Sequence, residues 1–463
     1  MVRLYDSLSG TVRELRLRDP GRVSIYVCGP TVYDFPHLGH GRFTLVWDAL
    51  RRWLSYTGLE VTYVSNITDI DDNIIARANR DGRTEAEVAG EYEDHWWKAM
   101  AAIGVARPTH TPHATEFVAA MVETISSLIL RNIAYRTSDG VYFDVSRVAD
   151  YGLLAGQPLE SLRAGARVEM VLEKRSPLDF AVWKNAKPGE PSWPAPFGDG
   201  RPGWHTECVV MSLDLLGPGF DLHCGGMDLR FPHHENERAQ ASALDLPFAQ
   251  HWAHNGWVMV GGDKMSKSLG NFTSLTDMLA QTDSRAYRLL VLRSHYRSPI
   301  EVTPTTVADA ERSLERFDAM ARRFDVPVHR SENFARSREL NWSEETLALL
   351  DRVGALLEND FDTPQAIATL FEALTVANAA ADGGEMDRGR ALAHAIGSLL
   401  AGLGLALRGE EKADIDGETA LLVRERDEAR AGKNWSEADR LRDELVARGW
   451  KVEDGSAGTI IRR

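Results

Sequence analysis

The chain has 463 residues, of which 43% are hydrophobic and 26% charged, a composition typical of a globular protein with more than one domain. Three cysteines exclude a disulfide scaffold and predict a reducing cytoplasm, and no apolar run approaches the about 20 residues that a membrane-spanning helix needs. The net charge of −15 argues against loose, charge-driven binding to any polyanion, although a local surface can still bind a specific nucleic acid.

The first elements in chain order are a strand, a helix and a second strand. Residues 22–29 (RVSIYVCG) are apolar and β-branched and are followed by proline, which predicts a strand and then a turn. Residues 43–58 have apolar side chains at helical spacing, and residues 60–71 (EVTYVSNITDID) predict the next strand. A βαβ unit of this length implies a parallel sheet, in which ligands bind at the carboxyl ends of the strands. Cys28 lies at that end of the first strand.

The later part of the chain divides into an insertion, a second sheet half and helices. A helical run at 116–131, a strand-like GVYFDVS and a Pro/Gly-rich stretch predict the insertion. Apolar strand-like runs then resume, and four runs with helical spacing follow residue 305. The predicted fold is therefore α/β, with a split Rossmann-type parallel sheet, an α-helical bundle and a small C-terminal region after a charged linker. The predicted parts are residues 1–110, 111–200, 201–305, 306–407 and 418–463.

A histidine-rich turn, PHLGH, follows the first strand and holds His37 and His40. Gly39 lets the backbone approach a ligand closely, and a helix that begins here offers free N–H groups and partial positive charge to a phosphate. Two imidazoles can also donate hydrogen bonds to a phosphate that gains charge in a transition state. The alternative is a capped turn with incidental histidines. The chain has no Walker P-loop, and no G-x-G-x-x-G follows a strand.

A second cationic motif, KMSKS, places Lys264 and Lys267 between glycines. Such a loop can hold a polyphosphate and move with it, whereas K-x-x-K alone is usually a solvated loop. Taken together, H-x-G-H and K-M-S-K-S resemble the signature pair of the class I aminoacyl-tRNA synthetases. The resemblance implies that the two motifs lie on opposite halves of a split nucleotide-binding fold.

Scattered thiol, imidazole and carboxylate side chains suggest a metal site. If PHHENER begins a helix, His233 and Glu237 share one face of it, whereas His234 lies off that face. Together with Cys28 and Cys208 they are acceptable ligands for tetrahedral zinc. Taken alone, each cysteine is more often a small buried apolar residue.

Within class I, the motifs resemble those of the cysteinyl-tRNA synthetases in their order and over essentially the whole chain. The matching segments are CGPTVYD, PHLGH, GWHTEC, GGMDLRFPHHENE and KMSKSLGN, and the C-terminal GKNWSEADRLRDELVARGWKVEDGSAGT also matches. The resemblance implies a cytoplasmic, monomeric enzyme that acts on ATP, L-cysteine and tRNA(Cys) and has no membrane partner. It also implies one Zn²⁺ per chain, Mg²⁺ with ATP, and an anticodon-binding role for the C-terminal region.

The same resemblance assigns roles to individual residues. Cys28, Cys208, His233 and Glu237 would bind the zinc. His37 and His40 would stabilise the α-phosphate of ATP, and Lys264 and Lys267 would hold the leaving pyrophosphate. Asp228 resembles the acid that binds the ribose, and Thr68 and Trp204 would line the amino-acid pocket. Cys224 has no role in this pattern.

Two other functions remain open from the sequence. The cysteine ligase of mycothiol synthesis activates cysteine in the same way but passes it to an amino sugar, and it lacks the extension that follows residue 405 here. A catalytically dead homologue that acts as a regulatory binding protein is the other alternative, and the intact HxGH and KMSKS motifs argue against it. In the C-terminal region, Trp435 beside Lys433 predicts either a base-stacking residue or a core tryptophan.

Overall fold

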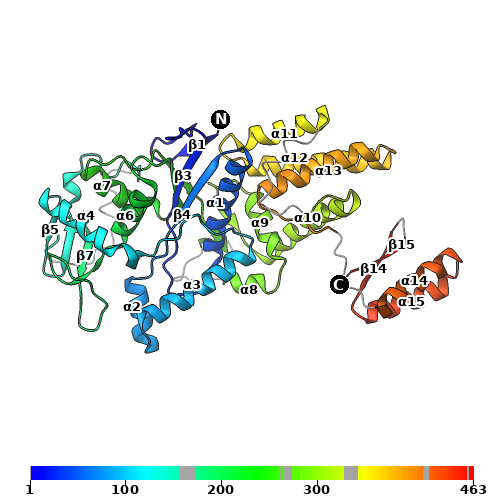
Figure 1. The fold of residues 1–463 in the computed structure, drawn as a ribbon, viewed down its shortest axis with the longest axis horizontal. Helices are drawn as coiled ribbons and strands as arrows, with labels where there is room; N and C mark the ends of the chain where they lie inside the picture. The colour runs from blue at the N-terminus through cyan, green and yellow to red at the C-terminus, as the bar shows by residue number, and fades with distance from the viewer. Residues whose placement is uncertain are drawn as a thin grey trace.

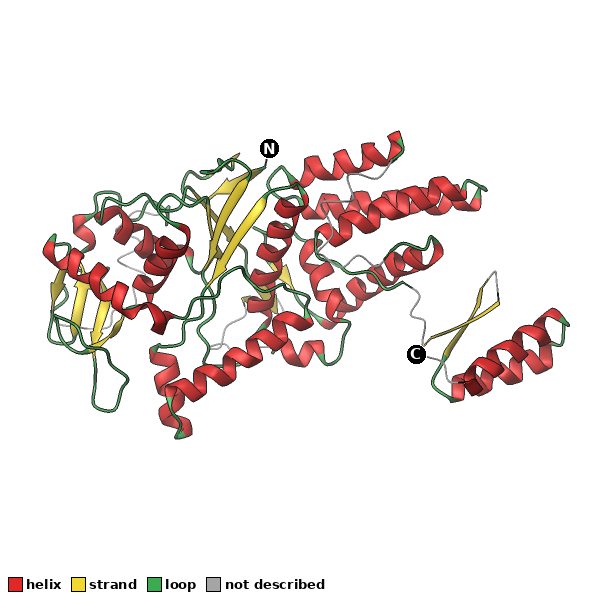
Figure 2. Cartoon of the chain, in the orientation of Figure 1, coloured by secondary structure: helices red, strands yellow, loops and turns green. Residues whose placement is uncertain are grey.

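The computed structural model describes residues 2–156, 173–260, 263–264, 274–327, 342–409, 417–455 and 458–462. Figure 1 shows a central sheet with a smaller mixed α/β unit on one side and a group of long helices on the other. Figure 2 separates these helices from the strands of the sheet by colour. Among the described residues, no helix combines the length and apolar character needed to cross a membrane.

The central sheet is parallel throughout, as the sequence predicts. Its strands lie in the order β10-β9-β3-β4. Because the chain leaves β3 for one neighbour and later returns on its other side, the crevice at the carboxyl end of β3 is the expected ligand site. The bounds of the strands are β3 Arg22–Val27, β4 Glu60–Ser65, β9 Leu222–Gly226 and β10 His251–Asn255.

Helix α1 (Leu38–Tyr56) connects β3 to β4 and begins at the histidine turn, as predicted, five residues before the apolar run at 43–58. This start has a local cause, because His37 and His40 cap the first turn with their side chains. The histidine motif therefore forms the N-terminus of the helix. Two further helices follow β4, namely α2 (Asp72–Asp81) and α3 (Glu85–Ala102).

The predicted insertion is a separate small unit with its own antiparallel sheet, of order β5-β6-β7-β8. Its helix α4 (Val118–Leu130) matches the predicted helical run, and its hydrophobic core includes Phe143, Phe180 and Trp183. The last strand leads directly into α6 (Trp204–Leu216), which returns the chain to the central sheet. The strands are β5 Ala134–Arg136, β6 Gly140–Phe143, β7 Phe180–Asn185 and β8 Gly200–Pro202.

The chain after residue 274 is mainly helical, which confirms the predicted helical bundle. One hydrophobic core runs from the sheet through α1 and into the bundle, so the two parts are packed together. The short strands β11 (Val258–Val260), β12 (Asp263–Lys264) and β13 (Ile300–Glu301) form a separate small sheet. The helices are α8 Leu275–Leu279, α9 Ser284–Leu292, α10 Pro304–Arg323, α11 Glu344–Leu357, α12 Thr363–Asp382 and α13 Met386–Gly402.

The ends of the chain carry two antiparallel hairpins. At the N-terminus, β1 (Arg3–Asp6) pairs with β2 (Thr11–Glu14). The C-terminal region has its own core, built from Leu422, Leu441, Leu445 and Trp450. Of the two alternatives for Trp435, the core tryptophan is wrong, because this residue is 60% exposed. The tryptophan buried in this core is Trp450. Its elements are α14 Gly417–Ala431, α15 Trp435–Ala447, β14 Lys451–Gly455 and β15 Gly458–Arg462.

A buried ion cluster joins α1 to the helical bundle. Asp48 accepts hydrogen bonds from Arg51, Arg52 and Arg288, and Arg288 also donates to the main-chain oxygen of Leu403, just after α13. Burial alone would raise the pKa of Asp48, but the neighbouring guanidinium groups outweigh it and lower the pKa from 3.8 to about 2.

This shift predicts a pH-dependent contribution to stability. A carboxyl group with a lowered folded-state pKa stabilises the protein above its unfolded pKa, and this stabilisation is lost as the pH falls through the folded value. We expect Asp48→Asn to be less stable than the wild type at pH 6. The difference in the free energy of unfolding between the two proteins should be smaller at pH 3 than at pH 6 by on the order of 1 kcal/mol. Urea unfolding of both proteins at each pH measures it. A difference that stays constant with pH would contradict this assignment.

Candidate active site and metal centre

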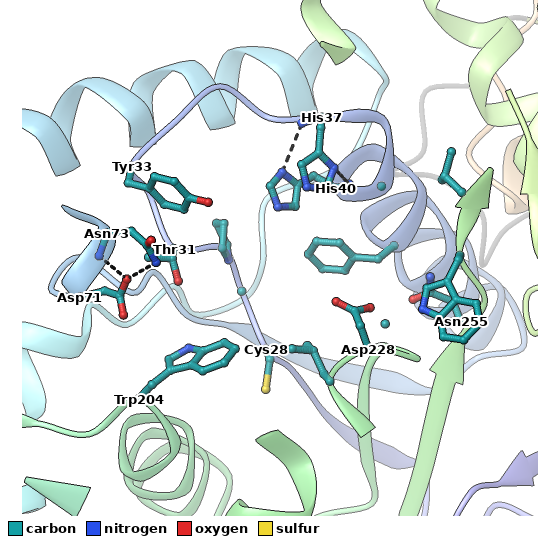
Figure 3. Close-up of a pocket in the computed structure, with 18 of the residues that line it drawn as sticks. Cys28, Thr31, Tyr33, His37, His40, Asp71, Asn73, Trp204, Asp228 and Asn255 are labelled. Carbon is teal, nitrogen blue, oxygen red and sulfur yellow. Dashed lines mark hydrogen bonds between the residues drawn. The ribbon is translucent and has the colours of Figure 1, made fainter. Parts of the chain in front are cut away.

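A cavity of about 430 Å³ opens at the carboxyl end of β3, where the topology of the sheet places a ligand site. Figure 3 shows its walls, with His37 and His40 at the top, Trp204, Cys28 and Asp228 along the bottom, and Asn255 at the lower right. The N-terminal half of the chain contributes Cys28, Gly29, Pro30, Thr31, Tyr33, His37, Gly39, His40, Phe43, Asp71 and Asn73. The later half contributes Trp204, Gly226, Asp228, Leu229, Asn255, Gly256, Trp257 and Val258.

His37 and His40 cap each other's backbone at the start of α1. The main-chain N–H of His40 donates to Nδ1 of His37, and the N–H of His37 donates to Nδ1 of His40, both at 3.2 Å. Their rings are stacked with centroids 3.5 Å apart. Because each Nδ1 accepts a hydrogen bond, a neutral ring carries its proton on Nε2. The caps thus set the tautomer in which Nε2 can donate to an anionic ligand.

The four predicted metal ligands meet in one buried cluster beside this cavity. The Sγ atoms of Cys28 and Cys208 are 3.6 Å apart, and Oε1 of Glu237 lies 3.4 Å from Sγ of Cys28 and 3.0 Å from Nε2 of His233. One ligand atom from each residue lies within 4.8 Å of every other. They come from three places in the fold, namely the end of β3, the first turns of α6, and the turn into α7 (Glu235–Ala243).

The spacing and chemistry of this cluster fit a tetrahedral zinc ion. Two sulfur ligands at about 2.3 Å from a tetrahedral ion lie about 3.8 Å apart, close to the 3.6 Å between the two thiols. Both thiols are free rather than joined in a disulfide. Without an ion, burial raises the pKa of both cysteines and lowers that of His233, so these three side chains are held in their neutral forms. Two thiols and a carboxyl group are costly to bury together, and a bound cation would offset this cost by binding them as ligands.

Further histidines surround the ligand set. His205 Nδ1 lies 2.9 Å from His233 Nδ1, which leaves Nε2 of His233 directed at Glu237. His223 Nε2 lies 2.8 Å from the other carboxylate oxygen of Glu237. Such contacts orient metal ligands and set their tautomers. Cys28 and Glu237 also form a second possible ligand group with His223 and His234, so spacing alone does not single out the first set.

The remaining predicted site residues occupy different positions relative to the cavity. Asp228 lies in its wall, next to Gly226, where a Cβ would come within 2.5 Å of the Asp228 carboxylate. Trp204 also lies in the wall, 39% exposed, with its ring stacked 4.0 Å from that of His233. Thr68 is buried instead, donates to Glu207 at 2.9 Å, and is not among the residues that line the cavity. Thr31 takes the lining position on that side.

The KMSKS motif falls partly outside the described residues. Lys264 ends β12, whose backbone pairs with β11, and β11 begins at Val258 in the cavity wall. The start of the motif is therefore connected to the cavity by one short hairpin. Lys267 lies outside the described residues.

The structure also adds residues that the sequence did not single out. Tyr33, Asp71, Asn73 and Trp257 line the cavity, and His205 contacts a predicted ligand. Position in the chain gives a partial signal for some of them, since Tyr33 lies in the loop after β3 and Asp71 follows β4. The sequence offers one indication for His205, namely its place between the predicted site residues Trp204 and Cys208.

Comparisons with known proteins agree on the family. Residues 14–312 match the model of the class I (C) tRNA synthetase catalytic domain, and residues 352–408 match the DALR domain. The chain is 43% identical to the cysteine–tRNA ligase of Laribacter hongkongensis over 477 aligned residues, and 43% identical to that of Methylobacillus flagellatus over 466. Each alignment covers 100% of both chains.

Solved structures of class I synthetases share the fold. A Mycobacterium tuberculosis methionyl-tRNA synthetase in complex with methionyl-adenylate superposes with a TM-score of 0.61 at 15% identity, over 83% of this chain and 91% of that one. An Agrobacterium radiobacter leucyl enzyme gives the same TM-score at 13% identity, over 85% of each chain. With the histidine turn, the buried thiol cluster and full-length identity above 40% in agreement, the chain belongs to the cysteine–tRNA ligase family of class I tRNA synthetases.

Proposed function

We propose that the protein joins L-cysteine to the 3′ end of tRNA(Cys) at the expense of ATP. The observation that carries the proposal is the position of the buried Cys28/Cys208/His233/Glu237 cluster beside a cavity that also holds the capped histidine turn. The cysteine carboxylate attacks the α-phosphate of ATP, which gives cysteinyl-adenylate and pyrophosphate. A hydroxyl group of the ribose at the tRNA 3′ end then takes the cysteinyl group, and AMP leaves.

In this proposal the chain acts mainly by positioning and charge stabilisation. His37 and His40 donate from Nε2 to the α-phosphate, in the tautomer that their mutual caps favour. Asp228 binds the ribose of ATP, which enters with Mg²⁺, and Trp204 contacts the amino acid. Thr31 is a better candidate than Thr68 for a second contact with the amino acid, because it lies in the cavity wall.

The metal would be held by Cys28, Cys208, His233 and Glu237, one ion per chain. When bound, zinc supplies a soft Lewis acid that favours a thiolate over a hydroxyl group. His205 and His223 keep His233 and Glu237 directed at the ion from outside. This arrangement would distinguish cysteine from serine, which a simple apolar pocket does poorly.

The proposed domain roles follow the chain. Residues 1–110 and 201–305 form the catalytic domain, 111–200 the insertion, 306–407 the helical domain and 418–463 the anticodon-binding region. We also propose that the protein works as a monomer in the cytoplasm. Three buried free thiols are the state expected in a reducing compartment.

Charging assays test the proposed acceptor. With labelled cysteine and ATP, we expect the label to become attached to tRNA(Cys) and not to the amino sugar of mycothiol synthesis. Transfer to the amino sugar alone would favour the alternative ligase. Absence of any cysteine-dependent exchange of pyrophosphate into ATP would favour an inactive homologue.

Lys267→Ala tests the proposed role of the KMSKS motif. We expect slower adenylate formation with nearly unchanged cysteine binding, because the lysine contacts the pyrophosphate side and acts mainly on the transition state. Single-turnover adenylate formation and calorimetric titration with cysteine measure the two effects. Loss of cysteine affinity at an unchanged rate constant would show that this role is wrong.

A further inference from the structure

Arg42 is a buried cation in the helix that begins with the histidine turn. It lies two residues after His40, and the residue is only 1% exposed. Burial lowers its pKa to about 10. Within the described residues it forms no ion pair with a carboxylate, and its Nε has no hydrogen-bond partner. Burying a guanidinium group without a carboxylate partner costs free energy. We therefore ask what the hydrogen bonds of Arg42 hold in place.

The hydrogen bonds that Arg42 donates all go to main-chain carbonyl groups on the other side of the fold. Nη1 donates to the oxygen of Trp257, and Nη2 donates to those of Tyr296, at 3.2 Å, and Ser298. The same two segments are also bonded to each other, since Gly256 N–H donates to Tyr296 at 2.8 Å and Ile300 N–H donates to Trp257 at 2.9 Å. One side chain therefore ties α1 to two connected backbone segments.

These contacts link two parts of the cavity wall. On the α1 side the wall contains His37, Gly39, His40 and Phe43, and on the other it contains residues 255–258. The second wall continues through β11 into β12 and the start of the KMSKS motif. Gly256 packs closely against the second segment that Arg42 binds, since a Cβ there would meet Ser298 O at 2.5 Å, so the two segments are held together as one unit.

We propose that Arg42 is a positioning residue that sets the distance between the histidine turn and the 255–258 wall, and thereby the width of the ATP site. This inference rests on the proposed function. Arg42 does not line the cavity itself, and the metal-ligand cluster is built on β3, α6 and α7, away from the carbonyl groups that it binds. Its loss should therefore affect ATP much more than cysteine.

The test compares Arg42→Met and Arg42→Lys with Arg288→Lys. Arg288 is a control because it is also a buried arginine that donates to main-chain oxygens, those of residues 103, 104 and 403. It also pairs with Asp48, and none of these partners lines the cavity. In Arg42→Met we expect the KM for ATP in cysteine-dependent pyrophosphate exchange to rise and kcat to fall. Together these changes should lower kcat/KM for ATP by on the order of 100-fold. Cysteine affinity, measured by calorimetry, should stay within about twofold of the wild type.

Arg42→Lys keeps the charge and should recover part of the loss, whereas Arg288→Lys should lower the melting temperature without changing the KM for ATP. A wild-type KM for ATP in a folded Arg42→Met protein would overturn the proposal. Parallel loss of ATP and cysteine affinity would also overturn it, by showing a merely structural role. If the wild type catalysed no exchange, the proposed function would fail, while direct calorimetric titration with ATP would still test Arg42.

Discussion

Replacing Cys208 with serine should remove tightly bound zinc and cysteine activation together. Its Sγ lies 3.6 Å from that of Cys28, and both belong to the only proposed ligand set that has two thiols. Serine offers a hard oxygen with a high pKa in a buried site, where it would be a poor ligand for zinc. Zinc content by elemental analysis and cysteine-dependent pyrophosphate exchange measure the two losses. We expect exchange to fall by at least about 1,000-fold.

Cys224→Ala is the matched control for this variant. Cys224 is equally buried, on β9, but belongs to neither possible ligand group. The control should keep one zinc per chain and most of its exchange activity. Full activity in Cys208→Ser without metal would show that the cluster does not serve the reaction. Zinc retained by Cys208→Ser and lost from Cys28→Ser would instead favour the second group, with His223 and His234.

Removing residues 410–463 should spare pyrophosphate exchange and abolish efficient charging of tRNA. The C-terminal region has its own hydrophobic core, so the cut does not expose the core of the catalytic domain. RNA sequence is read mainly where bases are unstacked, as in an anticodon loop. Loss of this contact should weaken tRNA binding and reduce its salt dependence.

The position of the cut comes from the structure. Leu405 and Leu407 belong to the main core, and the N–H of Arg408 donates to Asp318 at 2.8 Å. A cut at 405 would remove these contacts, whereas a cut after 409 preserves them. Trp435→Ala in the full chain is the point variant that accompanies the truncation, because this exposed ring is the proposed base-stacking residue. Full charging by the folded, truncated protein would show that the region does not recognise tRNA.

The βαβ unit and the helical bundle could be predicted from the sequence because hydrophobic periodicity is local information. The histidine turn was predicted to begin a helix, as α1 does, but apolar spacing does not reveal that the two histidines cap each other's backbone. The converging ligand set was implied by the family motifs and not by spacing, because its members are up to 209 residues apart in the chain. The structure brings them together.

Other contacts could not be foreseen because they depend on how distant segments pack. Thr68 and Thr31 both lie at the ends of neighbouring segments, and only the fold shows that Thr31 faces the cavity while Thr68 bonds to buried Glu207. Arg42 has no sequence feature that distinguishes it from a surface arginine of a helix. Its partners are more than 200 residues away, which makes its role visible only in the folded protein.

Exchange of labelled pyrophosphate into ATP, compared between cysteine and serine on the zinc-containing protein, shows whether the cluster selects a thiol substrate. The buried thiol-rich cluster beside the histidine turn predicts rapid exchange with cysteine. The kcat/KM for serine should be lower than that for cysteine by a factor on the order of 10⁴. Similar exchange with both amino acids, or none with cysteine, would contradict the claim that this cluster selects a thiol substrate for activation.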